Sequence, residues 1–107
     1  MNKSAPTETI ADRLAALSHP ARLAILAHLS RHDGCVCRDV VENLPLAQST
    51  VSQHLKVLVE AGLIIHERAM PRSVYRLNRE ALRGVSRELN TIIDECCADG
   101  CCAPANT

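Results

Sequence analysis

The sequence contains no tryptophan and no phenylalanine, and Tyr75 is its single tyrosine. The core of this 107-residue chain must therefore come from leucine, valine, isoleucine and alanine, which suits packed helices. No run approaches the roughly 18 apolar residues of a membrane span, and residues 1–6 lack the apolar stretch of a signal peptide. We expect a small, single-domain cytoplasmic protein with no membrane partner.

The sequence also lacks an excess of either charge, because its formal net charge is zero at pH 7. Its distribution is uneven, however: residues 48–79 carry mostly basic charges, and residues 80–107 mostly acidic ones. This asymmetry predicts a basic face that the overall balance conceals, with ordinary surface charge as the alternative. The basic side chains of the middle segment are Lys56, Arg68, Arg72, Arg76 and Arg79.

Cysteine is abundant, with six residues in two clusters. The absence of an export signal and the presence of adjacent cysteine pairs both argue against a disulfide framework. Clustered thiols in a reducing compartment more often bind a metal or respond to redox state. The cysteines are Cys35, Cys37, Cys96, Cys97, Cys101 and Cys102.

Apolar spacing predicts five helices, with Ser18 offering a cap and Pro20 placed in a first helical turn. Gly62 is the expected stop of the fourth helix. The apolar stripe of the last helix is long, which favours packing on a partner subunit over packing on its own core alone. The predicted helices cover residues 7–17, 20–31, 37–43, 47–61 and 78–95.

After Gly62 the apolar period changes from helical to alternating. Residues 63–66 and 73–77 are expected to form two strands, joined by a turn over residues 67–72. The fold class is thus mainly α with a small β-hairpin, in the order of a winged helix-turn-helix.

The fourth predicted helix has the pattern of a DNA-recognition helix, with early polar residues facing base edges in the major groove. Val51, Leu55 and Leu58 are expected to face inward. A purely solvated or capping role is the alternative for the polar residues. The candidate base contacts are Gln48, Ser49, Thr50 and Gln53; the candidate phosphate contacts are Ser52, His54 and Lys56; and the candidate wing contacts are Arg68 and Arg72.

These motifs together resemble the ArsR/SmtB family of bacterial metal-responsive winged-helix repressors. The resemblance is carried by residues 17–26, Cys35-Val36-Cys37, residues 48–55, residues 60–63 and residues 75–77, in family order. It implies a homodimer joined through its first and last helices, bound to a palindromic double-stranded operator and released by metal. The expected division is a flexible N-terminus over 1–6, the DNA-binding domain over 7–95 and a Cys-rich tail over 96–107.

The resemblance extends to a branch in which Cys35 and Cys37 would supply two of three thiolates to As(III) or Sb(III). That branch commonly carries a third cysteine where this chain has Val40. The third ligand is therefore expected from Cys96, Cys97, Cys101 or Cys102, within the subunit or across the dimer, or from a small thiol or solvent. Alternatively, these four cysteines form a separate site, including a tetrahedral one for Zn(II) or Cd(II).

Geometry constrains the cysteine pair. On a regular helix residues i and i+2 point about 200° apart, so a shared ion requires extended or unwound backbone near Cys35 and Cys37. We expect ion binding to distort the start of the third helix and thereby move the recognition helix.

Other readings remain open. One is a thiol-based redox or persulfide sensor on the same scaffold, and another is a cytosolic protein that buffers metal through its tail. A zinc site in the last helix is not expected, because residues 78–95 contain no histidine. His54 has a phosphate contact or helix packing as its possible roles. No phosphate loop or nucleophile constellation is present, so we do not expect an enzyme.

Overall fold

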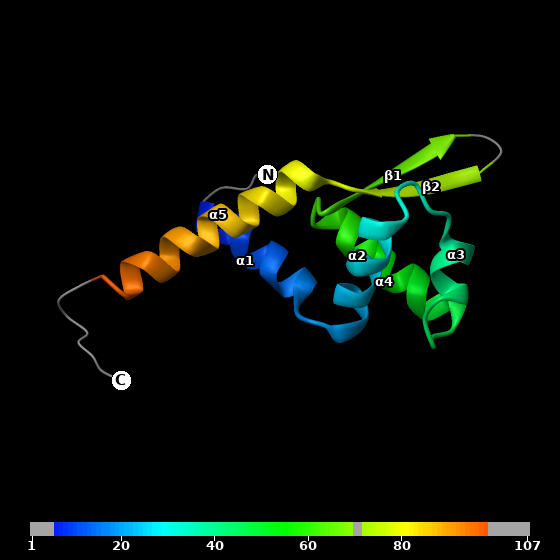
Figure 1. The fold of residues 1–107 in the computed structure, drawn as a ribbon, viewed down its shortest axis with the longest axis horizontal. Coiled ribbons are helices and arrows are strands. Elements are labelled where there is room, and N and C mark those ends of the chain that lie inside the picture. The colour runs from blue at the N-terminus through cyan, green and yellow to red at the C-terminus, as the bar shows by residue number, and fades with distance from the viewer. Residues whose placement is uncertain (1–5, 70–71, 99–107) are drawn as a thin grey trace.

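The computed structural model describes residues 6–69 and 72–98. Within them the chain forms five helices and one antiparallel hairpin, which confirms the predicted winged helix-turn-helix order (Figure 1). No helix in this described part is long and apolar enough to cross a lipid bilayer. The elements are α1 (Pro6–Leu17), α2 (Pro20–Arg31), α3 (Cys37–Glu42), α4 (Gln48–Glu60), β1 (Ile64–Ala69), β2 (Arg72–Leu77) and α5 (Arg79–Cys96).

The helix ends follow from local chemistry, with one correction. His19, not Ser18, caps α2, because its Nδ1 accepts from the Ala21 N–H at 3.1 Å. Ser18 instead donates to the Ala15 carbonyl at the end of α1. Gly62 ends α4 as predicted, with a φ of 80° that glycine adopts without strain.

The core lies between α2, α3, α4 and the start of the hairpin. Val51, Leu55 and Leu58 on α4 are fully buried, which confirms the predicted inner face of this helix. They pack with leucine, isoleucine and valine side chains from the surrounding elements, and no large aromatic is needed to fill the space. The other fully buried side chains are Ile25, Leu29, Val40, Leu63 and Ile64.

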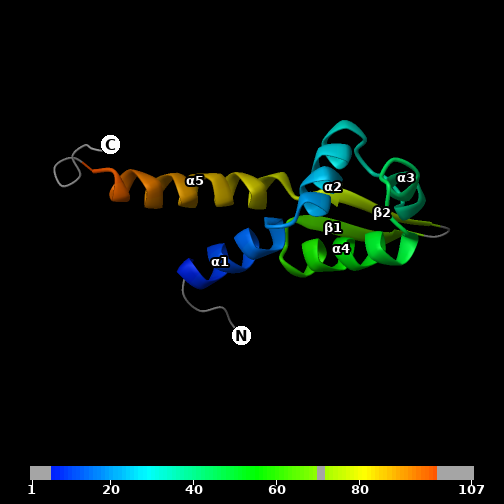
Figure 2. The ribbon, with the colours of Figure 1, turned by 90° about the horizontal axis from the view of Figure 1, so that it is seen from below.

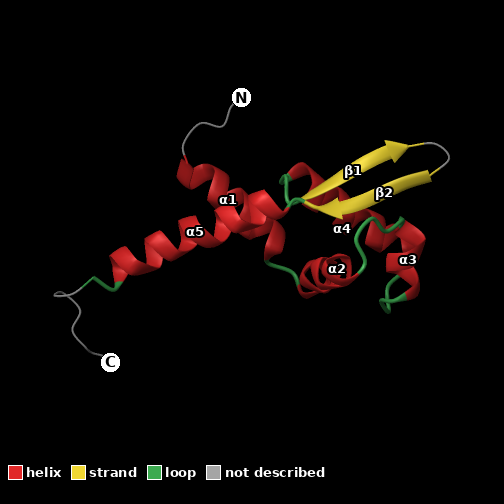
Figure 3. Cartoon of the chain, turned by 45° about the horizontal axis from the view of Figure 1, so that its top comes forward, coloured by secondary structure: helices red, strands yellow, loops and turns green. Residues whose placement is uncertain are grey.

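The hairpin is longer than predicted. Its register pairs Ile64 with Leu77 at the base and Arg68 with Ser73 further out. The strands thus continue through most of the segment expected to be a turn, so Arg68 lies within β1 and Arg72 begins β2. Figure 3 shows this wing beside α3 and α4, and contacts join α4 to β1 and α3 to β2.

Helices α1 and α5 contact each other and together form an arm at one end of the molecule (Figure 2). The first half of α5 is anchored by Val85, which is buried. Further along, Ile92 and Ile93 are 37% and 50% exposed. The end of the predicted apolar stripe therefore has no covering within the described part of this single chain.

Candidate nucleic-acid interface and cysteine pair

The outer face of α4 carries the predicted polar side chains. Apart from His54, none has the side-chain burial of a core residue, and their helix presents them opposite Val51, Leu55 and Leu58. Ala47 precedes the helix without a side-chain cap, and no acidic residue occupies its first turn. The N-terminal end of α4 thus offers N–H groups and no negative charge, which suits approach to a phosphate backbone. The exposed residues are Gln48, Ser49, Thr50, Ser52, Gln53 and Lys56.

His54 lies differently from the expected phosphate contact. Its side chain is buried, its Nδ1 accepts from the Arg22 Nε at 3.2 Å, and its ring centroid lies 4.5 Å from that of His19. Burial, followed by the charges of His19 and Arg22, lowers the pKa of His54, so the neutral acceptor form is favoured. This placement corresponds to the helix-packing role, and we leave His54 out of the DNA-contact set.

On the wing, Arg68 is exposed near the outer end of β1. The side chain of Arg72 lies outside the described residues. Arg76 is engaged elsewhere, because its guanidinium contacts Glu67 at 2.9 Å and Asp33 at 3.2 Å. That second ion pair ties the middle of β2 to the loop that precedes Cys35.

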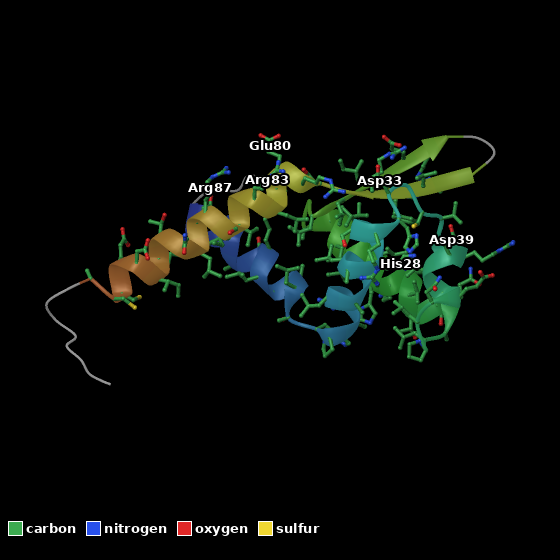
Figure 4. The ribbon with its side chains drawn as sticks, viewed as in Figure 1. His28, Asp33, Asp39, Glu80, Arg83 and Arg87 are labelled. Atoms are coloured by element: carbon green, nitrogen blue, oxygen red, sulfur yellow. The ribbon has the colours of Figure 1, made fainter. Side chains whose placement is uncertain are left out.

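Cys35 is buried at the junction between that loop and the wing. Its backbone forms an isolated antiparallel bridge with Tyr75, with N–H to carbonyl distances of 3.1 and 2.7 Å. Its thiol donates to the His32 carbonyl at 2.7 Å. Burial raises the pKa of Cys35, and the carboxylates of Asp39 and Asp33 raise it further (Figure 4).

Cys37 begins α3 and is only partly buried. Its Sγ lies 3.7 Å from the Ser52 hydroxyl on the outer face of α4. A surface hollow opens beside it, lined by Val36, Arg38, Asp39 and Ser73. Solvent and small solutes can therefore reach this thiol directly.

Val36, between the two cysteines, has extended backbone with φ −90° and ψ 164°. This is the backbone form that the geometric argument required, because side chains two residues apart in extended chain share a side. The cysteine pair thus stands at a strand-to-helix transition and not within a helical turn.

A third ligand is not assembled in the described residues, which contain no group of three or more His, Cys, Asp or Glu placed to hold a metal. Val40, at the position where the resemblance to the arsenite-sensing branch implies a third cysteine, is fully buried. Cys96 and Cys97 are exposed at the far end of α5, remote from α3 (Figure 1). Cys101 and Cys102 lie outside the described residues. The donors present fit a two-thiol site that needs a further ligand.

Two residues were missed by sequence reasoning, Tyr75 beside Cys35 and Arg22 beside His54. Tyr75 was used only as part of the strand pattern. In the fold its backbone forms the β-bridge with Cys35, and its ring stacks on His66 with ring centroids 4.4 Å apart. Burial raises the pKa of Tyr75, and the charge of Cys37 raises it further. Arg22 was seen only as part of a motif. No local sequence pattern predicts these contacts, because their partners are distant in sequence.

A short helix, a tight connection, a second helix with a polar outer face and a two-stranded wing define a winged helix-turn-helix DNA-binding protein. Comparison with known proteins agrees: residues 17–67 match the family model of a helix-turn-helix domain.

Similar proteins narrow the assignment from this general class to one family. The chain is 37% identical over 87 residues to the arsenical resistance operon repressor of Staphylococcus xylosus, covering 79% of this chain and 83% of that protein. It is 39% identical over 89 residues to that of Bacillus subtilis, covering 81% and 84%. An ArsR-like transcriptional regulator from Rhodococcus superposes with a TM-score of 0.76 at 27% identity, over 83% of each chain.

The chain therefore belongs to the ArsR/SmtB family of winged helix-turn-helix transcriptional repressors. The family consists of DNA-binding regulators and not of enzymes.

Proposed function

We propose that this protein is a metalloid-responsive repressor that binds operator DNA as a homodimer and is released when As(III) or Sb(III) binds Cys35 and Cys37. The observation that carries the proposal is the position of the two thiols. Cys37 lies against Ser52 on the recognition helix, while Cys35 is bridged to Tyr75 in the wing. The names of the two arsenical resistance repressors support this choice of inducer.

Ion binding would be coupled to DNA release through the contacts that Cys35 must lose. To bind an ion jointly with Cys37, its thiol must leave the His32 carbonyl and lose its proton. Turning this buried side chain outward strains the bridge to Tyr75 and the head of α3, which supports α4. The inducer would thus favour the DNA-free arrangement by the difference between its affinities for the two forms.

The homodimer is proposed through α1 and α5. The uncovered Ile92 and Ile93 at the end of α5 give such an interface apolar area. One similar solved structure, a DNA-binding domain from Mycobacterium bovis, is described as homodimeric. Two-fold symmetry would place one α4 in each half-site of a palindromic operator.

The decisive experiment is fluorescence anisotropy with the upstream DNA, titrated with As(III), Sb(III), Cd(II) and Zn(II). The Cys35→Ser, Cys37→Ser double variant should bind DNA like the wild type and lose release by arsenite. The matched control is Cys96→Ser, Cys97→Ser. If the first variant is still released normally and the control is not, the sensor is the C-terminal cluster.

A redox or persulfide response on the same scaffold is a second candidate, favoured by the partly exposed thiol of Cys37 beside the buried one of Cys35. It differs in its product, which is a covalently modified or bridged cysteine. Mass spectrometry after oxidant or polysulfide, beside a metalloid titration, separates the two candidates. Cd(II) and Zn(II) remain further possible inducers, and the titration above includes both.

A further inference from the structure

Arg22 joins three helices. From α2 its Nη1 donates to the carbonyls of Ala15 and Ala16 at 3.4 and 3.2 Å, and its Nε donates to His54 on α4. The two carbonyls belong to the last turn of α1, where a cation is favoured, and the Ala15 carbonyl also accepts from Ser18. One half-buried guanidinium thus links the end of the arm to the middle of the recognition helix.

Arg13 makes a second link between the arm and α4. From the middle of α1 its Nε donates to the carbonyl of Ala61, the C-cap of α4, at 3.1 Å. Arg13 also lines two surface hollows, one shared with Glu60 and the other shared with Arg87 on α5. Figure 4 shows Arg87 on the exposed edge of α5.

We infer that Arg13 and Arg22 form a clasp that fixes the angle between the recognition helix and the dimer-forming arm, and so sets which half-site spacing the dimer accepts. The inference rests on the proposed homodimeric operator complex. Neither arginine has to touch DNA: each is a positioning residue that acts through α4.

Helix α4 is long enough for a small change in its angle to shift the DNA-facing end by about one base pair. Helix α4 has 13 residues, so it is about 20 Å long at ~1.5 Å per residue. A swing of about 10° around its Ala61 end displaces the Gln48 end by roughly 3.5 Å, close to the ~3.4 Å rise of one base pair. A fixed clasp therefore distinguishes spacings that differ by one base pair, whereas a loose one does not.

The test uses the full chain and an operator located by footprinting on the upstream DNA. Duplexes carry the two half-sites with the spacer unchanged, or lengthened or shortened by one base pair, and a further duplex carries one half-site. Arg13→Met keeps most of the side-chain volume and removes the donors, while Arg13→Lys keeps the charge. Arg31→Met removes a charge from an exposed position outside the clasp and is the matched control.

Wild type and Arg31→Met should bind the altered spacers at least about tenfold more weakly than the natural one, since each added base pair also rotates the second half-site by roughly 35°. Arg13→Met should reduce this ratio to about threefold or less, with unchanged half-site affinity. Arg13→Lys should restore part of the ratio. Circular dichroism and sedimentation confirm that the variants fold and dimerise.

If Arg13→Met keeps the wild-type ratio of affinities for natural and altered spacers, the clasp is refuted. It is also refuted if the variant loses half-site and operator affinity equally while that ratio stays unchanged. A different failure concerns the proposed function. If the wild type sediments as a monomer or does not bind the operator, both proposals fall together.

Discussion

Replacing Val40 by cysteine tests whether the cysteine pair lacks only a third thiol. Val40 lies three residues after Cys37, on the same face of α3 and one turn further on. It is fully buried and shares the core cluster with Cys35. A thiol at this position therefore enters the neighbourhood of both existing sulfurs without any change in the surface of the protein.

The cost of the substitution is small. Valine to cysteine removes about one methyl group, so the free energy of unfolding should fall by about 1 kcal/mol. Val40→Ala removes two and should cost about 1.5–3 kcal/mol, including the cavity. The alanine variant is thus the matched control: any DNA release that follows from destabilisation alone will be larger in it than in Val40→Cys.

The assay is arsenite-dependent release of fluorescent operator DNA, with near-ultraviolet absorption reporting arsenic–thiolate bonds. We expect Val40→Cys to lower the arsenite midpoint at least about tenfold, which corresponds to roughly 1.4 kcal/mol. Val40→Ala should leave the midpoint unchanged. A folded Val40→Cys protein with an unchanged midpoint and no added absorption would refute the reasoning that only a third thiol is missing.

Three further results are expected. Iodoacetamide should modify Cys37 well before Cys35, as peptide mass mapping would detect, because Cys35 is buried with a raised pKa; equal rates would contradict this. Burial lowers the pKa of both His28 and His54 below 6.5, so the unfolded chain binds more protons. The free energy of unfolding from urea titrations should therefore fall as the pH drops below 6.5, by at most about 1.4 kcal/mol per pH unit for each imidazole. Leu55→Ala should lower the free energy of unfolding by about 2–5 kcal/mol in urea titrations, since its side chain is fully buried; a loss below 1 kcal/mol would mean that α4 is loosely packed.

Much of the fold was predictable because its signals are local. The helical spacing of Val51, Leu55 and Leu58 specifies one buried face, and all three are fully buried. Gly62 marks the change from helical to alternating period, and the structure places the end of α4 there. The polar residues of α4 are exposed for the same reason, since they occupy the opposite face of a helix whose inner face is fixed.

The errors occur where a partner is distant in sequence. His54 was counted among the outward polar residues, although it lies three residues after Val51 and four before Leu58, which is the spacing of the inner face. Its burial is tolerable because Arg22, 32 residues earlier, donates to its ring. The length of the hairpin is a similar case, since cross-strand pairs such as Glu67 with Val74 decide where a strand stops.

The cysteine pair shows why spacing alone predicts two candidate ligands but not how each is connected to the rest of the fold. In sequence Cys35 and Cys37 look equivalent, as two thiols one residue apart. In the fold they belong to different elements: Cys35 is bridged to the wing through Tyr75, and Cys37 contacts the recognition helix through Ser52. An ion that binds both thiols, as proposed, would therefore act on α4 and the wing at once. In a single-cysteine variant that still binds the ion, the ion would act on only one of these elements. DNA release should then be partial even at saturating inducer. Complete release would instead indicate coupling through α3 alone.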